Sequence, residues 1–249
     1  MDLIEIVKVG GVMVLGGIIQ SSSGFGFGLF AIPILLFFGF DLPTTVTMVV
    51  IGSAIQKVAA VKVLREHLEW RELIPFFLTG LVVLPLGVCT MSKLSAMDQT
   101  VVKQLIGAVV FLLLVLRWKG AIKPQEKVPR KWGYIAGFFS GFLNGLANIG
   151  GPPLVLWILA HKWSNQQMRV TVIAFSLLYV PFQLALMLLT FGTVILDPML
   201  KAFLLCPTVL AGTWIGLKIG ERISKEHLAV YMQVLLFLIA ISAILKPLF

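Results

Sequence analysis

The sequence predicts an all-α polytopic membrane protein, and three observations carry this prediction. The mean hydropathy is +1.00, 59% of the 249 residues are hydrophobic and 12% are charged, which lies outside the range of soluble globular domains. Apolar stretches close to the length of a membrane helix recur along the chain. Two of these stretches are broken at matching places in the two halves. We therefore expect two inverted repeats, each a broken, re-entrant helical hairpin plus three transmembrane helices.

The basic residues indicate a membrane topology rather than a nucleic-acid partner. The net charge is +9 and the pI is near 9.8, but lysine and arginine cluster in short loops between apolar stretches. Cytoplasmic loops of membrane proteins have this composition. The expected partners are the lipid bilayer and a small solute, with no nucleic acid, and the sequence leaves the oligomeric state open.

The N-terminus and the cysteines give two smaller expectations. The first residues lack the basic start and the small-residue cleavage site of a signal peptide, so we expect the first apolar run to belong to the mature protein. Cys89 and Cys206 lie within apolar stretches. Both are expected to be buried, inert thiols.

The first apolar run, residues 4–40, is interrupted near its middle by small polar residues and glycines. The interruption consists of Gln20, Ser21, Ser22, Ser23, Gly24, Phe25, Gly26, Phe27 and Gly28. Glycines spaced two apart do not form one face of a helix, so the alternation at Gly24, Gly26 and Gly28 predicts an unwound loop. Apolar stretches follow at residues 43–63, 73–91 and 100–116 and complete the N-terminal repeat, residues 1–117.

The second half repeats this layout after a basic linker, residues 118–131. Its first apolar run, residues 134–160, is broken around a stretch that includes Asn144, Asn148, Ile149, Gly150 and Gly151 and ends at Pro152-Pro153. Further apolar stretches lie at residues 166–189, 202–218 and 228–245 and complete the C-terminal repeat, residues 132–249.

The basic loops fix the expected orientation. The linker should be cytoplasmic, as should residues 161–169 and 218–225, with the loop 193–201 outside. These positions agree only if the second broken run enters and leaves on the same side. With the same hairpin for the first run, both chain termini are expected outside, and each hairpin arm is expected to have about 13 to 18 residues.

Several residues inside the expected helices have two readings. Gly137 and Gly141 are expected to serve helix packing. Gln56, Gln183, Ser176 and Tyr179 are expected to form hydrogen bonds between helices, with cavity lining as the alternative.

The breaks are predicted to bind an anion. The arms that follow them would begin near Leu29 and Pro153, and helix N-termini at the middle of the membrane favour negative charge. The three serines, Asn144 and Asn148 could add neutral donors, so we expect a site that needs no buried cation. All eleven acidic residues lie at chain ends, in loops or at their borders, where they cannot ligate a cation at mid-membrane.

Two basic residues enter the expected spans. Lys57 and Arg169 lie about one turn or more from the expected cytoplasmic helix ends. The simpler expectation is that both side chains snorkel to the interface. The alternative is that they draw anions into an inner vestibule.

The pattern resembles the TauE/SafE family, also described as sulfite exporter-like. The resemblance lies in residues 23–28 with Pro33, in Gly137, Gly141, Gly145 and residues 150–153, and in the four-plus-four layout of the whole chain. It implies export or uptake of small sulfur-containing anions such as sulfite, thiosulfate or organosulfonates like sulfoacetate. Phe25 and Phe27 could narrow the cavity that binds the substrate, or contact a carbon-bearing substrate.

The expected function is a secondary transporter with alternating access, a probable exporter. An anion channel of the same architecture, or a transporter of another small anion, is the alternative. An enzyme is not expected, because the sequence has no acid/base or nucleophile constellation, and no cofactor or metal site is expected. Absence of a nucleotide-binding loop argues against direct ATP coupling. The coupling ion and the direction of transport stay open.

Overall fold

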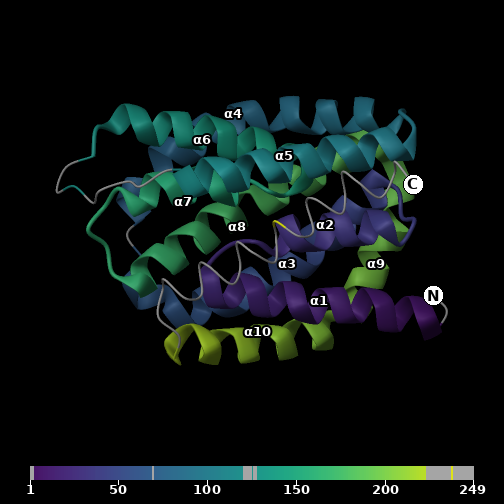
Figure 1. The fold of residues 1–249 in the computed structure, drawn as a ribbon, viewed down its shortest axis with the longest axis horizontal. Coiled ribbons are helices and arrows are strands. Elements are labelled where there is room, and N and C mark those ends of the chain that lie inside the picture. Colours follow the sequence, from purple (N-terminus) through teal and green to yellow (C-terminus); the bar gives the residue numbers. More distant parts are fainter. Residues whose placement is uncertain (1–2, 69, 120–124, 126–127, 223–236, 238–249) are drawn as a thin grey trace.

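The computed structural model describes residues 3–68, 70–119, 125, 128–222 and 237 (Figure 1). Within these residues the fold is helical throughout, apart from an isolated bridge between Gln125 and His161. The α-helices are α1 (Leu3–Ser23), α2 (Phe27–Phe37), α3 (Leu42–Leu64), α4 (Trp70–Ser95), α5 (Gln99–Lys119), α6 (Arg130–Ala147), α7 (Gly151–Leu159), α8 (Asn165–Phe191), α9 (Leu196–Leu204) and α10 (Cys206–Arg222). The predicted all-α fold is confirmed. The predicted span 228–245, apart from residue 237, and half of the linker 118–131 lie outside the described residues.

Among the described residues, four segments are long and apolar enough to cross a membrane, which makes this a membrane protein. They are Leu3–Ser23, Leu42–His67, Leu73–Ser95 and Gln166–Leu204. Two shorter apolar segments, Phe27–Phe37 and Gln99–Leu113, accompany them.

Both predicted breaks interrupt the helices. The first separates α1 from α2 at Gly24, Phe25 and Gly26, where the two glycines have φ values of 88° and 108°. Glycine adopts this left-handed backbone without the steric cost of a Cβ. The unwound loop is shorter than expected, because Gly28 already belongs to α2.

The second break, residues 148–150, begins in the same way. Asn148 has φ 51°, and it directly follows α6 as Gly24 directly follows α1. Asparagine tolerates this backbone better than most residues that carry a Cβ. The returning helices begin at Phe27 and Gly151, two residues before the predicted starts near Leu29 and Pro153.

The arms of the two hairpins differ in length from each other and, in part, from the prediction. Helices α2 and α7 have 11 and 9 residues, or about 17 and 14 Å at 1.5 Å per residue, and are too short to cross a bilayer core of about 30 Å. Helix α1 has 21 residues, which exceeds the predicted arm and is long enough to span. In Figure 1, α2 lies toward the side of the N-terminus and α7 toward the opposite side.

The prediction that residues 193–201 form a loop is wrong. A 3-10 turn, Gly192–Ile195, joins α8 to α9, and α9 leads through Leu205 into α10. Asp197 and Lys201 lie one turn apart on α9 with their charges 2.8 Å apart, and Lys201 also lies 3.9 Å from Glu5 of α1. These polar residues are the face of a short helix rather than a loop.

Small residues let helices of the two halves approach closely. On α6, a Cβ at Gly137 would collide with the carbonyl of Phe76, and one at Gly141 with the backbone of Gly80. Their predicted packing role is therefore confirmed: α6 packs along α4, as Figure 1 also shows.

Helices α1 and α10 pack in the same way, with Gly212 against Val14 and Gly216 against Ile18. The first arm of each hairpin thus packs against a helix from the other half of the chain. The inverted repeat itself stays a prediction.

The expectation for the cysteines is wrong. Cys89 is exposed on α4 and Cys206 is half-buried at the start of α10. The outer surface of a membrane helix faces apolar lipid, so an apolar sequence position does not have to be an interior one.

Candidate functional site

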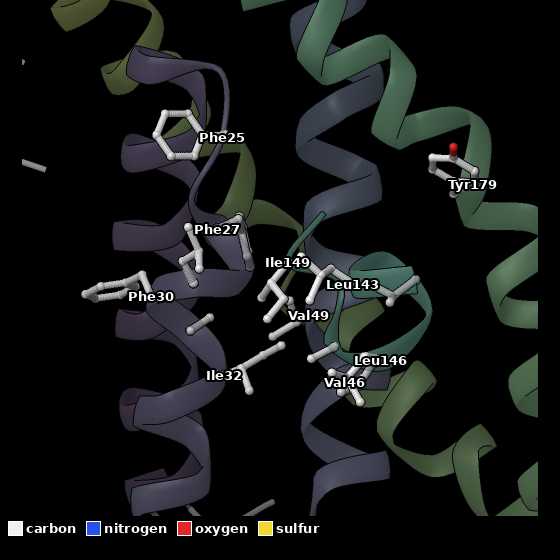
Figure 2. Close-up of a cluster of buried hydrophobic side chains, with 14 of the residues drawn as sticks. Phe25, Phe27, Phe30, Ile32, Val46, Val49, Leu143, Leu146, Ile149 and Tyr179 are labelled. Atoms are coloured by element: carbon white, nitrogen blue, oxygen red, sulfur yellow. The ribbon is translucent and has the colours of Figure 1, made fainter. Parts of the chain in front are cut away.

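The two breaks meet in the interior and enclose a cavity. A Cβ at Gly28 would collide with the Asn148 carbonyl, and one at Gly151 would lie 2.9 Å from the Phe25 Cβ. Figure 2 shows Ile149 lying between Phe27 of α2 and Val49 of α3. The cavity is lined by Gln20, Gly24, Phe25, Gly26, Gly28, Leu29, Lys57, Asn144, Asn148, Ile149, Gly151, Pro152, Val172 and Ser176.

Several predicted site residues line this cavity and others do not. Those that line it are Gln20, Gly24, Phe25, Gly26, Gly28, Asn144, Asn148, Ile149 and Gly151. Those outside the lining are Ser21, Ser22, Ser23, Phe27 and Gly150. Whether any of them binds a substrate stays a prediction.

The serines of the first break are engaged inside the protein. Ser22 and Ser23 donate from Oγ to the Ile19 carbonyl, at 3.0 and 2.8 Å, as hydroxyls in helices often do. Ser21 Oγ accepts a hydrogen bond of 2.9 Å from Gln56 Nε2. Their hydroxyls hold the end of α1 in place.

The two returning helices begin at the cavity but differ in what they offer an anion. Neither helix start has a side-chain cap, so backbone N–H groups of the first turn are not satisfied by a capping side chain. At α7 two of the first three residues are Pro152 and Pro153, which have no N–H. The N–H groups at this cavity therefore come mainly from α2.

Lys57 brings a buried amine to the cavity. Its side chain is 2% exposed, and its Nζ lies 3.5 Å from Asn148 Oδ1. The expectation that Lys57 snorkels is wrong, because the side chain points toward the second break. The cavity lining therefore includes a basic side chain, in addition to the neutral donors that were expected.

Asn148 is held between two residues of α3. Its Nδ2 donates to Ser53 Oγ at 2.9 Å, while its Oδ1 accepts from Lys57. The rest of the second break is fastened by Ser140, whose Oγ donates to the Gly150 carbonyl at 2.7 Å. The asparagine side chain thus has a fixed orientation at the edge of the cavity.

Most of the polar residues within the helices form hydrogen bonds to a neighbouring helix, as expected. Gln183 Nε2 donates to the Asn144 carbonyl at 2.5 Å, and Tyr179 Oη donates to the Phe77 carbonyl at 3.2 Å. Gln56 reaches Ser21, as described above. Ser176 differs, because it bonds the Ile173 carbonyl of its own helix and lines the cavity.

Arg169 is also buried, at 4% exposed, but does not line the cavity. Its Nη2 donates to the Ser21 carbonyl, and its backbone packs against Gly24. The guanidinium therefore satisfies a carbonyl at the end of α1, where helical partners are missing. The snorkelling expectation is wrong for Arg169 too.

Leu29, Pro152 and Val172 were not expected in the site, and cavity lining was the alternative expectation for Ser176. Ser176 carries a detectable signal, a hydroxyl in a long apolar helix, whereas Val172 and Leu29 carry none. The lining contains no carboxylate, and the described residues contain no group of three or more metal-ligating side chains.

Comparison with known proteins identifies the family of this chain. The family described as "Sulfite exporter TauE/SafE" matches residues 9–243. A curated protein of Cupriavidus necator, described as "Probable sulfite/organosulfonate exporter TauE", is 25% identical over 162 residues, which cover 64% of this chain and 62% of that protein. The chain thus matches less than two thirds of that relative's length. No solved structure matches the chain. Because the family match covers most of the sequence, the chain belongs to the TauE/SafE sulfite exporter family.

Proposed function

We propose that this protein is a secondary transporter that binds a small sulfur-containing anion, such as sulfite or an organosulfonate, between its two breaks. The observation that carries the proposal is the cavity at which both breaks meet around the amine of Lys57. An ionisable group inside a membrane protein marks a substrate site by default.

The cavity chemistry fits an anion better than a cation. Lys57 and the N-terminal turn of α2 both favour negative charge. Asn144, Gln20 and Ser176 add neutral side chains that can donate hydrogen bonds to an oxyanion. Since no carboxylate lines the cavity, a cation would find carbonyl and hydroxyl oxygens but no opposite charge.

The apolar part of the lining suits a substrate with a short carbon chain. Phe25, Leu29, Ile149 and Val172 surround the polar groups. A sulfonate would place its charged oxygens beside the polar groups and its carbon atoms against these apolar side chains.

Alternating access would follow from two equivalent hairpins. The breaks lie at matching positions after α1 and α6, and Gly24 and Asn148, the first residue of each break, both have a positive φ. Four residues earlier on each arm, Gln20 and Asn144 both line the cavity. This equivalence, with the crossed packing of the halves, supports inverted repeats 1–117 and 132–249. The linker 118–131 would be cytoplasmic and both termini outside.

Counterflow in proteoliposomes tests the proposal. Purified protein is reconstituted and exchange is measured with sulfite, thiosulfate, sulfoacetate, sulfate and chloride. Saturable exchange of a sulfur anion is expected. Flux that does not saturate and shows no counterflow would indicate an anion channel, and no flux with any sulfur anion would overturn the proposal.

Two variants at Asn148 connect the exchange to the cavity. Asn148→Leu removes the partner of Lys57 and also strains a left-handed backbone position. Asn148→Gly removes the same side chain without that strain. Weakened exchange in both variants is expected. Full activity of Asn148→Gly would show that the asparagine side chain does not serve the site.

A further inference from the structure

We propose that Lys57 carries a proton across the membrane together with each anion, so that transport is coupled to protons. This inference rests on the proposed function and names the coupling ion of the same site. It follows from the surroundings of the Lys57 amine, which hold no compensating charge among the described residues.

Lys57 lacks an ionic partner in the described part of the chain. Its side chain is 2% exposed, and its hydrogen-bond partner there is the neutral Oδ1 of Asn148 at 3.5 Å. The ion pairs among the described residues involve Lys201 with Glu5 and Asp197. A buried ammonium without an opposite charge is strongly disfavoured.

The helices packed against α3 offer Lys57 no alternative counter-charge within bonding distance among their described side chains. The described titratable side chains on these helices are Glu5 and Lys8 of α1; Cys89 and Lys93 of α4; Arg169 and Tyr179 of α8; Asp197 and Lys201 of α9; and Cys206, Lys218 and Glu221 of α10. The 3-10 turn Arg65–His67, which follows α3, adds the exposed side chains of Arg65, Glu66 and His67. Arg169 and Tyr179 are bonded to backbone carbonyls. The Lys218 ammonium lies 3.4 Å from the centre of the Trp214 ring.

The missing charge can be supplied by the substrate itself. In the empty cavity the Lys57 amine is neutral and bonds Asn148. When an anion enters, the amine takes a proton from water on the open side and the two opposite charges pair. After the cavity opens to the other side, the anion leaves and the ammonium returns its proton to water there.

This cycle moves one anion and one proton in the same direction. For a singly charged anion, the positive charge of the ammonium cancels the charge of the anion, so the loaded cavity has the same net charge as the empty one. The membrane voltage therefore does not drive the movement of the loaded cavity. The concentration gradients of anion and proton then set the direction. Export against an inward proton gradient requires a larger outward gradient of the anion.

Isethionate is the probe, because any proton that moves with it must be carried by the protein and not by the substrate. It is a sulfonate whose single charge is constant over the working pH range, unlike that of sulfite. Proteoliposomes contain a pH-sensitive dye, and potassium with valinomycin holds the voltage at zero. We expect about one proton to enter with each isethionate. A pH difference of about one unit, acid outside, should accumulate isethionate about tenfold.

Lys57→Arg is the test variant, because arginine keeps its proton. Its isethionate flux should be reduced, and the remaining flux should move without protons. Lys62→Arg on the same helix is the matched control, since Lys62 is exposed. That variant should keep both the flux and the accompanying protons.

Calorimetry provides a second readout that does not need transport. Isethionate is titrated into the purified full chain in two buffers of different ionisation enthalpy. Wild type should take up a proton on binding, and any binding by Lys57→Arg should take up none.

Each outcome decides a specific claim. Isethionate counterflow in wild type without proton movement, or without a response to the pH gradient, overturns the coupling and leaves the proposed function standing. Proton movement or proton uptake that persists in Lys57→Arg overturns the assignment to Lys57. Failure of wild type to exchange any sulfur anion overturns the proposed function and this inference together.

Discussion

The contact between the two breaks predicts that the methyl group of Gly28→Ala is not tolerated. A Cβ at this position would overlap the carbonyl of Asn148 and would lie 3.2 Å from Ile149 Cγ2. The carbonyl belongs to backbone held by Ser140 and Gln183, so it cannot rotate away as a flexible side chain could. The two breaks would have to separate.

The magnitude follows from two opposing effects. Alanine in a helix interior is favoured over glycine by about 0.5–1 kcal/mol. Overpacking a tight contact costs about 1–3 kcal/mol. The net change should be a destabilisation of up to about 2 kcal/mol, and a change of 1 kcal/mol corresponds to about 2–4 °C in a protein of this size.

Thermal unfolding of the detergent-solubilised protein measures this change, with Gly11→Ala as the control. Gly11 lies within α1 and has no atom within 4 Å of the position where a Cβ would be placed. Gly11→Ala should therefore unfold at the same or a higher temperature than wild type, and Gly28→Ala at a lower one. If both variants are equally stable, the breaks do not touch as described.

Three further predictions concern the cavity and its border. Lys57→Met removes the charge that faces the anion, which should weaken binding by about 2–5 kcal/mol, measured as the half-saturation concentration of counterflow. Arg169→Met leaves the buried Ser21 carbonyl without its donor, so the free energy of unfolding should fall by about 1–3 kcal/mol, measured by thermal unfolding. Phe25→Ala widens the cavity and should favour longer sulfonates over isethionate, measured as the ratio of their half-saturation concentrations. An unchanged value in any of these assays contradicts the corresponding contact.

The breaks could be predicted from the sequence because their cause is local. Glycines two apart and a glycine pair followed by two prolines cannot continue a helix, wherever the segment is placed. The exact helix starts could not be predicted in the same way, because Phe27 and Gly28 are compatible with both loop and helix.

The role of Lys57 could not be predicted because it depends on a contact between distant parts of the chain. From its position in the span, a lysine near the helix end can extend to the interface. It instead faces Asn148, 91 residues away. The serines show the opposite case: they suggested donors in the cavity, but within a helix their hydroxyls bond the Ile19 carbonyl or Gln56.

Helix α9 was not predicted, because polar residues between two apolar stretches are also typical of a loop. Asp197 and Lys201 are four residues apart, a spacing that places them on one helical face. The same spacing was available in the sequence. A charge-based topology alone does not distinguish a short helix at the membrane border from an irregular loop.

Substrate protection of a cysteine in the cavity tests the central claim most directly. Ser176→Cys is introduced into a chain in which Cys89 and Cys206 are replaced by alanine, and the rate of maleimide modification is measured with and without the anion that exchanges best. We expect the anion to slow the modification, and the concentration that gives half of this effect should equal the half-saturation concentration of counterflow. A cysteine at the exposed Ser95 should be modified at an unchanged rate. Modification of Ser176→Cys that is equally fast with and without the anion would contradict a binding site between the two breaks.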